Sequence, residues 1–372
     1  MDGRKPEVGM LIVIMAAGTG GHVFPGLAMA DELRARGHEV IWLGSPRGLE
    51  QRLVPAAGLV LEQIDVAGVR GKHGLGLLFA PLRIARALWQ SVLILRRLQP
   101  AMVLGMGGFV SGPGGLAAWL LRIPLCIHEQ NAIAGLTNRW LSRLAQRVLV
   151  AFPGTLTDAG DKVTEVGNPV RSSLHNLPVP DERFAGRHGL RLLIVGGSQG
   201  AHRLNQVVPA AVGQLQAQLG AENIEVWHQT GERDADLVQR NYLTLNIRAR
   251  VGAFIDDMAA AYSWADLVIC RAGALTLAEL TAVGLGAVLV PFPHAVDDHQ
   301  TANARWLSQA GGAVLIQEQL LTPATLASQL QVLGNERAKL IDMANKARAL
   351  ARPQATQQMA DICLEVAHAD AA

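Results

Sequence analysis

Three glycine-rich segments follow apolar runs and carry backbone suited to binding anions. The first is Gly18-Thr19-Gly20-Gly21, with the ionisable His22 directly after it; the others span residues 105–115 and 196–201. A glycine turn at the start of a helix presents N–H groups without an intrahelical partner, and the helix dipole adds partial positive charge. The segments therefore favour binding of phosphate or sugar, although a tight strand-to-helix turn would show the same glycines.

The first two of these segments do not match the common dinucleotide motif. Val23 and Val110 stand where G-x-G-x-x-G has its third glycine, and G-x-x-x-x-G-K-[ST] occurs nowhere in the chain. Those motifs position the phosphates of NAD and ATP. The sequence therefore predicts neither a dinucleotide site nor a P-loop.

Polar side chains follow two further apolar runs. His128-Glu129-Gln130-Asn131 comes after residues 124–127, and Glu129 is the only acid between residues 66 and 157. Glu279 follows residues 266–270, where a carboxylate on the first turn of a helix is well placed to accept both hydroxyls of a ribose. The structural alternatives are a helix cap at residues 128–131 and a capping box formed by Thr276 and Glu279.

Metal-ligand spacing is weak throughout the chain. Asp234-Ala235-Asp236 resembles a metal-holding D-x-D, but it lies in a charged stretch, and we interpret it as solvated surface. No other cluster has convincing spacing, so we expect no metal and no cofactor. The polar segment 291–303 is instead typical of a loop that reads a sugar.

Strands alternating with helices would position these residues. Helical patterns at residues 27–33, 81–98 and 202–219 separate apolar runs that are typical of buried parallel strands. The runs are residues 10–16, 39–43, 101–104, 124–127, 147–151, 190–195, 223–228, 248–252, 266–270, 286–291 and 313–316. This alternation predicts an α/β fold in two halves, each opening on a strand, a glycine turn and a helix. The turn-rich residues 172–189 are interpreted as a linker, and residues 336–369 as helical with a break at Pro353.

The composition limits the kinds of stabilising site and the cellular compartment that we expect for this chain. Half of the 372 residues are hydrophobic, and the net charge is only +2. Three cysteines without C-x-x-C spacing argue against a disulfide framework or a zinc site, and they favour a reducing cytoplasm. Arg, Pro or Gly interrupts every long apolar run before the length of about 20 residues that a membrane span needs.

A basic segment without acids spans residues 66–128. Its Arg and Lys residues accompany apolar side chains, as in proteins that meet anionic lipid headgroups at a membrane surface. An amphipathic helix with a solvated basic edge is the alternative. Nucleic acid is not expected as a partner, because stacking aromatics are missing. The predicted membrane patch comprises Arg70, Lys72, Leu78, Phe79, Leu82, Arg83, Arg86 and Trp89.

The order of these motifs closely resembles glycosyltransferase family 28, and within it the peptidoglycan N-acetylglucosaminyltransferases. The resemblance rests on residues 18–26, 105–115, 128–138, 166–171, 196–201 and 254–258. It covers nearly the whole chain. Two positions depart from the family pattern: Ala17 replaces a common glycine, and His299 stands where some members have glutamine.

This resemblance implies a GT-B architecture, in which two Rossmann-like doubly wound domains face a central cleft. Residues 1–170 would bind the acceptor and the membrane, residues 171–352 would bind the UDP-sugar, and a helix within residues 353–372 would pack back on the first domain. The donor, UDP-N-acetylglucosamine, would be held by Thr19, Gly20, Gly21, Asn131, Arg171, Ser198, Ile255, Ala274, Leu275, Thr276, Leu277, Ala278, Glu279 and Gln300. The diphosphate of the acceptor would contact Gly107, Gly108, Ser111 and Asn138.

The implied reaction is an inverting, metal-independent transfer to the C4 hydroxyl of undecaprenyl-diphospho-muramoyl-pentapeptide. His22 is the first candidate for the general base, and Glu129 is the second. The resemblance places the enzyme at the cytoplasmic face of the bacterial inner membrane, with cell-wall synthesis proteins as further partners. The alternatives are a UDP-N-acetylglucosamine 2-epimerase-like enzyme, another UDP-sugar glycolipid transferase, and a non-catalytic nucleotide-sugar-binding or scaffold protein.

Overall fold

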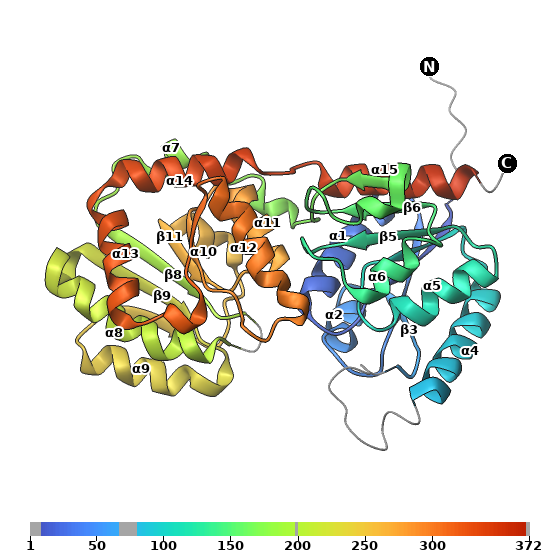
Figure 1. Cartoon of the computed structure of the whole chain (residues 1–372), viewed down its shortest axis with the longest axis horizontal. Helices are drawn as coiled ribbons and strands as arrows, with labels where there is room; N and C mark the ends of the chain where they lie inside the picture. Colours follow the sequence, from blue (N-terminus) through green and yellow to red (C-terminus); the bar gives the residue numbers. More distant parts are fainter. Residues whose placement is uncertain (1–8, 67–79, 198–199, 370–372) are drawn as a thin grey trace. The chain divides into compact units, whose positions relative to one another are not determined.

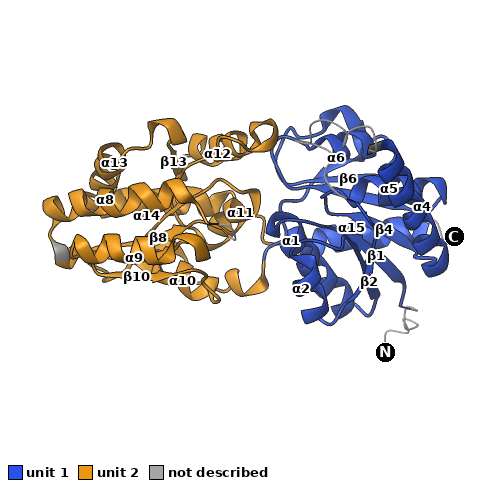
Figure 2. Cartoon of the chain, turned by 90° about the horizontal axis from the view of Figure 1, so that it is seen from below, with its two compact units in different colours: residues 1–170, 354–372 blue, residues 171–353 orange. Residues whose placement is uncertain are grey.

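Two parallel sheets organise the chain, one in each of two units (Figures 1 and 2). The computed structural model describes residues 9–66, 80–197 and 200–369. Unit 1 comprises residues 1–170 and 354–372, and unit 2 comprises residues 171–353. The chain therefore leaves its first unit once and returns to it at the end.

The sheet of unit 1 has the strand order β3-β2-β1-β4-β5-β6-β7, and all neighbouring strands are parallel. The order reverses between β1 and β4, where the loops after both strands leave the same edge of the sheet in opposite directions. Ligands of open α/β sheets bind at such a reversal. The strands are β1 (Leu11–Met15), β2 (Glu39–Gly44), β3 (Val60–Gln63), β4 (Met102–Gly105), β5 (Leu125–Glu129), β6 (Arg147–Val150) and β7 (Val163–Glu165).

Successive side chains of β1 point to opposite faces of the sheet, and this explains why helices cover both faces. Ile12 and Ile14 pack with α1 and α15, whereas Val13 and Met15 pack with α4 and α5. Both faces are therefore apolar and must be buried. The helices of unit 1 are α1 (Gly20–Ala35), α2 (Glu50–Ala56), α4 (Ala80–Leu98), α5 (Ser111–Leu120), α6 (Leu136–Leu141) and α15 (Ala355–Ala369), with the 3₁₀ helix η1 (Thr157–Lys162).

The last helix, α15, belongs to unit 1. It packs on α1, β4 and β6, and its residues Met359 and Cys363 are fully buried. An ion pair of 2.5 Å joins Arg36 at the end of α1 to Asp361. Residues 355–369 therefore complete the core of unit 1.

The sheet of unit 2 repeats the same plan in the order β10-β9-β8-β11-β12-β13, again with parallel neighbours. Its reversal lies between β8 and β11. The strands are β8 (Leu190–Val195), β9 (Ile224–Gln229), β10 (Ala249–Gly252), β11 (Leu267–Cys270), β12 (Ala287–Leu289) and β13 (Ala313–Leu315).

Helices also cover both faces of the second sheet. Leu192 and Ile194 face α8, α9 and α13, while Leu193 and Val195 face α10, α11 and α12. The helices are α7 (Pro180–Phe184), α8 (His202–Leu219), α9 (Ala235–Thr244), α10 (Met258–Trp264), α11 (Ala274–Val283), α12 (His299–Gln309), α13 (Pro323–Asn335) and α14 (Arg337–Ala349). The 3₁₀ helices are η2 (Ser172–Leu174), η3 (Ala221–Asn223), η4 (Glu232–Asp234), η5 (Val296–Asp298) and η6 (Glu318–Leu320).

The predicted α/β class with two parallel, doubly wound sheets is confirmed. The sequence pattern missed β3 and β7, which are short, partly polar strands at the two edges of the first sheet. The prediction of a linker at residues 172–189 is wrong. Phe184 lies in the core of unit 2, and the buried Arg183 donates a hydrogen bond of 2.7 Å to the carbonyl of Val283.

Candidate functional site

The first glycine turn of unit 1 begins a helix earlier than the pattern of apolar residues predicted. Helix α1 starts at Gly20 with Thr19 as its N-cap, so that Gly20, Gly21 and His22 form its first turn. The first N–H groups of a helix lack an intrahelical acceptor, although the N–H of His22 donates here to the carbonyl of Thr19 at 3.1 Å. The backbone expected to bind an anion is therefore at the end of β1, next to the strand reversal.

The second glycine segment contacts this turn closely. A Cβ atom on Gly107 would lie 2.5 Å from Cδ2 and 2.9 Å from Nε2 of His22, and 3.4 Å from Oε1 of Gln130. Gly108 approaches the carbonyl oxygen of Ala17 so closely that a side chain has no room. The glycines thus allow the His22 ring, the backbone of Gly107 and the Gln130 amide to meet at the ends of β1, β4 and β5.

Ser111 stabilises the second segment from within. Its hydroxyl donates to the carbonyl of Gly107 at 2.9 Å, and it accepts from the N–H of Gly107 at 3.1 Å. The side chain is fully buried. Ser111 therefore holds the shape of this segment.

Glu50, on α2, is a site residue that sequence reasoning missed. Its carboxylate accepts the N–H of Gly18 at 3.0 Å and the hydroxyl of Ser45 at 2.7 Å, and the residue is fully buried. It thereby fixes the start of the first glycine turn. Only its position shortly after β2, among glycine and serine residues, could have indicated this role.

The polar cluster after β5 is built into the unit. The His128 ring donates from Nε2 to the carbonyl of Gly167 at 3.0 Å, and burial lowers the pKa of His128 to about 4. Asn168 donates to the carbonyl of Gln130 at 3.1 Å. The cluster therefore ties the end of β5 to the segment that follows β7.

Glu129 is surrounded by donors. Its carboxylate accepts from the N–H of Asn131 at 3.0 Å, the N–H of Gly135 at 3.1 Å and the amide of Asn138 at 2.9 Å. Burial raises the pKa of Glu129, and these hydrogen bonds act in the opposite direction. The geometry gives Glu129 and Asn138 the task of holding the loop at 129–138, and this favours His22 over Glu129 as a base.

The third glycine segment, in unit 2, lies at the end of β8. Gly200 has φ +74° and no room for a Cβ atom beside the carbonyl of Thr230. Helix α8 begins directly afterwards, at His202. Ser198 lies outside the described residues, so its predicted contact with the donor stays a prediction.

The interpretation of Asp234 as solvated surface is wrong. Asp234 is 7% exposed and accepts from the amide of Asn205 at 2.9 Å. It also contacts Nδ1 of His202, at 2.8 Å, and Nε of Arg233, at 3.7 Å. Asp234 therefore supports the start of α8.

Glu279 lies in the second turn of α11, not in the first as expected. The helix begins at Ala274 with Gly273 as its N-cap, so the capping box of Thr276 and Glu279 is not formed. The nearly buried Glu279 carboxylate accepts from the Tyr262 hydroxyl at 2.9 Å and contacts Nη2 of Arg171 at 3.3 Å. Burial raises the pKa of Glu279, whereas Arg171 and Tyr262 lower it.

The predicted donor segment 274–279 has two sides. Ala274, Leu277 and Glu279 are buried, while Leu275, Thr276 and Ala278 are partly exposed. Ile255 packs at the edge of the neighbouring core. Leu275, Thr276 and Ala278 therefore form the accessible side of this segment, while Glu279 keeps 7% of its surface exposed.

The loop before α12 is fixed by side chains. Oε1 of Gln300 accepts from the N–H of Phe292 at 2.9 Å, and His299 contacts the carbonyl of Val296 at 2.7 Å. Asp297 and Asp298 adopt left-handed backbone with φ +53° and +52°. Such backbone is unfavourable for most residues with side chains and occurs at functional loops.

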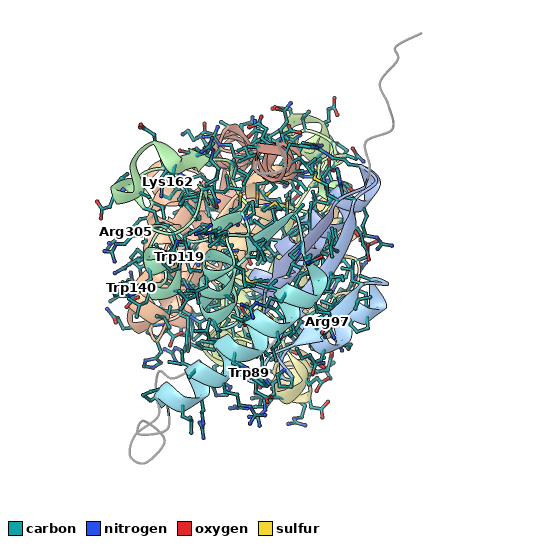
Figure 3. All side chains as sticks on the ribbon, turned by 90° about the vertical axis from the view of Figure 1, so that its right-hand side faces the viewer. Trp89, Arg97, Trp119, Trp140, Lys162 and Arg305 are labelled. Atoms are coloured by element: carbon teal, nitrogen blue, oxygen red, sulfur yellow. The ribbon has the colours of Figure 1, made fainter. Side chains whose placement is uncertain are left out.

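The predicted membrane patch is described only in part. Arg70, Lys72, Leu78 and Phe79 lie outside the described residues. On α4, Leu82 is 69% exposed and Trp89 is 62% exposed, and Arg83 is exposed as well. We call Leu82, Arg83, Arg86 and Trp89 the α4 surface; Figure 3 shows Trp89 on one face of unit 1.

Although residues 66–128 contain no acid, two arginines of this segment form ion pairs with acids from outside it. Arg86 pairs with Asp65 at 2.7 Å, and Arg97 pairs with Glu62 at 2.7 Å. Both acids precede residues 66–128 in the sequence. Glu62 lies on β3 and Asp65 follows that strand, and the fold places both beside α4. Among the described helices, none is long and apolar enough to cross a membrane.

Comparison with known proteins identifies the family. Residues 12–150 match the glycosyltransferase family 28 N-terminal domain, and residues 191–362 match the family 28 C-terminal domain. The chain belongs to glycosyltransferase family 28. This glycosyltransferase is 52% identical over 358 residues to the UDP-N-acetylglucosamine--N-acetylmuramyl-(pentapeptide) pyrophosphoryl-undecaprenol N-acetylglucosamine transferase of Marinobacter nauticus. The match covers 96% of this chain and 97% of the relative.

Solved structures agree with this assignment. The crystal structure of Acinetobacter baumannii MurG has 43% identity and a TM-score of 0.81, and the match covers 96% of this chain and 99% of the other. The predicted GT-B fold is thereby confirmed. A UDP-GlcNAc 2-epimerase from Neisseria meningitidis has a TM-score of 0.66 at 12% identity, with 96% and 100% of the two chains covered. That likeness shows a shared fold alone.

Proposed function

We propose that this family 28 glycosyltransferase transfers N-acetylglucosamine from UDP-N-acetylglucosamine to undecaprenyl-diphospho-muramoyl-pentapeptide, which converts lipid I to lipid II in peptidoglycan synthesis. The relative with 52% identity over nearly the whole chain carries this activity in its name. In support, each strand reversal carries a glycine turn at the start of a helix. One such site suits the diphosphate of the donor, and the other suits the diphosphate of the acceptor.

Unit 2 is proposed to hold the donor. The N-terminus of α8 and the Arg171 guanidinium supply positive charge for a diphosphate. Glu279, held by Tyr262 and Arg171, is proposed to accept the ribose hydroxyls, with Gln300 and the exposed side of residues 274–279 around the sugar. Departure of UDP would be assisted by this charge and by backbone N–H groups.

Unit 1 is proposed to hold the acceptor and the general base. The C4 hydroxyl of the muramoyl sugar attacks the anomeric carbon, its proton passes to an imidazole nitrogen of His22, and the bond to UDP breaks with inversion. His22 suits this role because it lies in the first turn of α1 beside Gly107 and Gln130. Thr19, Gly20, Gly21 and Asn131 are proposed to reach the donor from this unit.

The α4 surface is proposed to bring unit 1 to the cytoplasmic face of the membrane, as a peripheral contact. Leu82 and Trp89 are mostly exposed, and Arg83 lies beside them. Apolar side chains stabilise such a contact when they are buried at the boundary of the acyl chains, and basic neighbours stabilise it by attraction to anionic headgroups. Cell-wall synthesis proteins at the same membrane remain proposed partners.

The test is a transfer assay with radiolabelled UDP-N-acetylglucosamine and a short-chain muramoyl-pentapeptide diphospholipid, with and without EDTA. We expect a labelled lipid product in both conditions. Absence of the product would overturn the proposed function. Loss of activity in EDTA would overturn the metal-independent mechanism and leave the substrate assignment standing.

A further inference from the structure

A buried tyrosine hydroxyl joins two helices of unit 2. Tyr262 on α10 is fully buried, and its hydroxyl donates to Oε2 of Glu279 on α11 at 2.9 Å. A buried hydroxyl needs a hydrogen-bond partner because water does not reach it. A neutral acceptor would meet that need. The use of a carboxylate, which is costly to bury, therefore indicates a role beyond packing.

The Glu279 carboxylate keeps acceptor positions open after its contacts within the unit. Oε2 accepts from the Tyr262 hydroxyl, and Oε1 contacts Nη2 of Arg171 at 3.3 Å. Among the residues that the structure describes, no other group donates to this carboxylate. A carboxylate has about four lone-pair positions, divided between its two oxygens. Each oxygen therefore keeps one position, which matches the adjacent 2′ and 3′ hydroxyls of a ribose.

Helix α10 also follows a segment with a predicted donor contact. It begins at Met258, directly after Asp257, whose Oδ1 accepts from the N–H of Ala260 at 2.9 Å. Ile255, which is predicted to contact the donor, comes shortly before this cap and packs against the core that contains Tyr262. The Tyr262 hydroxyl therefore links the helix that follows this segment to the carboxylate proposed to contact the ribose.

The charge of Glu279 depends on its neighbours. Burial raises the pKa of Glu279, while Arg171 and the Tyr262 hydroxyl lower it. Cys270, at the end of β11, is also buried nearby; burial and the charge of Glu279 raise the pKa of its thiol to about 12, so it stays neutral. An ionised carboxylate only accepts hydrogen bonds, whereas a protonated one carries an O–H donor. Arg171 and Tyr262 therefore favour the form of Glu279 that accepts two hydroxyls.

We propose that Tyr262 is a positioning residue for the ribose of the nucleotide-sugar. Its hydroxyl orients the Glu279 carboxylate, so that the open position on each oxygen faces one ribose hydroxyl. Without this hydrogen bond, the attraction of Arg171 alone sets the orientation of the carboxylate. The inference rests on the proposed function, in which Glu279 accepts the ribose hydroxyls.

Calorimetric binding of UDP and of 2′-deoxy-UDP to the full chain tests this role. The ratio of the two dissociation constants measures the contribution of one ribose hydroxyl. The variant is Tyr262→Phe, which removes the hydroxyl and keeps the ring. The matched control is Tyr242→Phe. Tyr242 is also fully buried in unit 2, but its hydroxyl contacts His228, at 3.0 Å, in the core on the other face of the sheet.

We expect the wild type to bind UDP at least about tenfold more tightly than 2′-deoxy-UDP, as for loss of a hydrogen bond to a charged group. In Tyr262→Phe this ratio should be at least about threefold smaller, and in Tyr242→Phe it should stay within about twofold of the wild type. A smaller change in Tyr262→Phe, or an equal change in both variants, would overturn the role of Tyr262.

Two further measurements separate positioning from general support of the fold. In the Glu279→Gln background, Tyr262→Phe should leave the ratio unaltered, because Tyr262 acts through the carboxylate. As the pH is lowered, Tyr262→Phe should lose affinity for UDP at a higher pH than the wild type, because the pKa of Glu279 rises further without the hydroxyl. Coincident pH profiles, or a further loss in the Glu279→Gln background, would contradict the proposal.

These binding measurements need no lipid acceptor, so they are distinguishable from failure of the proposed transfer reaction. If the wild type bound no UDP, or bound UDP and 2′-deoxy-UDP equally, the ribose contact of Glu279 and the role of Tyr262 would be overturned together. A wild-type preference for UDP that Tyr262→Phe retains would overturn the role of Tyr262 alone.

Discussion

The proposed general base, His22, has closely packed surroundings. Its ring lies against Gly107, where any side chain would displace it. We expect His22→Ala to lower kcat about 10²-fold or more with little change in donor KM, because a general base acts in the transition state. Steady-state kinetics would measure this, with the exposed His368→Ala as a control. A fall of only a few-fold would assign His22 to positioning.

Glu129 gives a contrasting prediction at the same scale. Three donors from residues 131–138 converge on its carboxylate, so replacing one oxygen by an amide group places donor against donor. Glu129→Gln should lower the free energy of unfolding by about 1–3 kcal/mol. The shape of the pH profile of kcat should stay as in the wild type. Loss of the acidic limb of that profile would instead make Glu129 the base.

Local pattern could indicate some site residues and not others. The glycine turns and Glu279 could be identified from the sequence because each follows an apolar run within a few residues. Glu50 and Tyr262 were missed because their partners are distant in sequence: the N–H of Gly18 lies 32 residues from Glu50, and Tyr262 lies 17 residues from Glu279. Such contacts follow from strand order, which a local pattern does not contain.

Helix α15 is the element whose packing can be tested most directly. Met359 is fully buried against the face of the sheet that α1 also covers, while its neighbour Gln358 is exposed. Met359→Ala should lower the free energy of unfolding of unit 1 by about 2–5 kcal/mol, as cavities in cores do. Gln358→Ala should change it by less than about 0.5 kcal/mol. Urea unfolding followed by hydrogen exchange in unit 1 would separate the two, and equal effects would contradict the assigned packing.

Element boundaries were predictable where apolar runs are long. The pattern indicated residues 202–219 as a helix, and α8 has these bounds. The sequence pattern placed the start of α1 too late because Gly20 and Gly21 are poor helix formers. In the structure, hydrogen bonds from the N–H groups of His22 and Val23 to the carbonyl of Thr19 form the first turn. β7, with three residues, is too short to show a periodic pattern.

At the scale of the molecule, one plan occurs twice. Each unit places its first strand in the interior of a sheet with helices on both faces. Both of these strands are therefore mainly apolar runs in the sequence. That is why the fold class could be predicted from the sequence. The repeated plan also brings one glycine turn to each strand reversal. These two turns are the ones that we propose bind the diphosphates of the donor and the acceptor.

A buried histidine in each unit makes the stability of the whole molecule sensitive to acid. Burial lowers the pKa of His128 in unit 1 to about 4 and that of His228 in unit 2 to about 3. Unfolded histidine titrates near 6.5, so between these values the unfolded state binds more protons than the folded state. The free energy of unfolding should therefore fall as the pH decreases below about 6.5, by a few kcal/mol for each histidine.

His228 provides the variant that tests this prediction. Its ring contacts the Tyr242 hydroxyl and the Asn205 side chain, each at 3.0 Å, so it is held neutral between two polar partners. His228→Gln should be less stable than the wild type at pH 8, yet its stability should change less between pH 6.5 and 4, because no proton is taken up at this position on unfolding. Urea unfolding across that range measures both effects, with the exposed His294→Gln as control. If His228→Gln kept the wild-type slope, the acid sensitivity of unit 2 would have to arise from other groups.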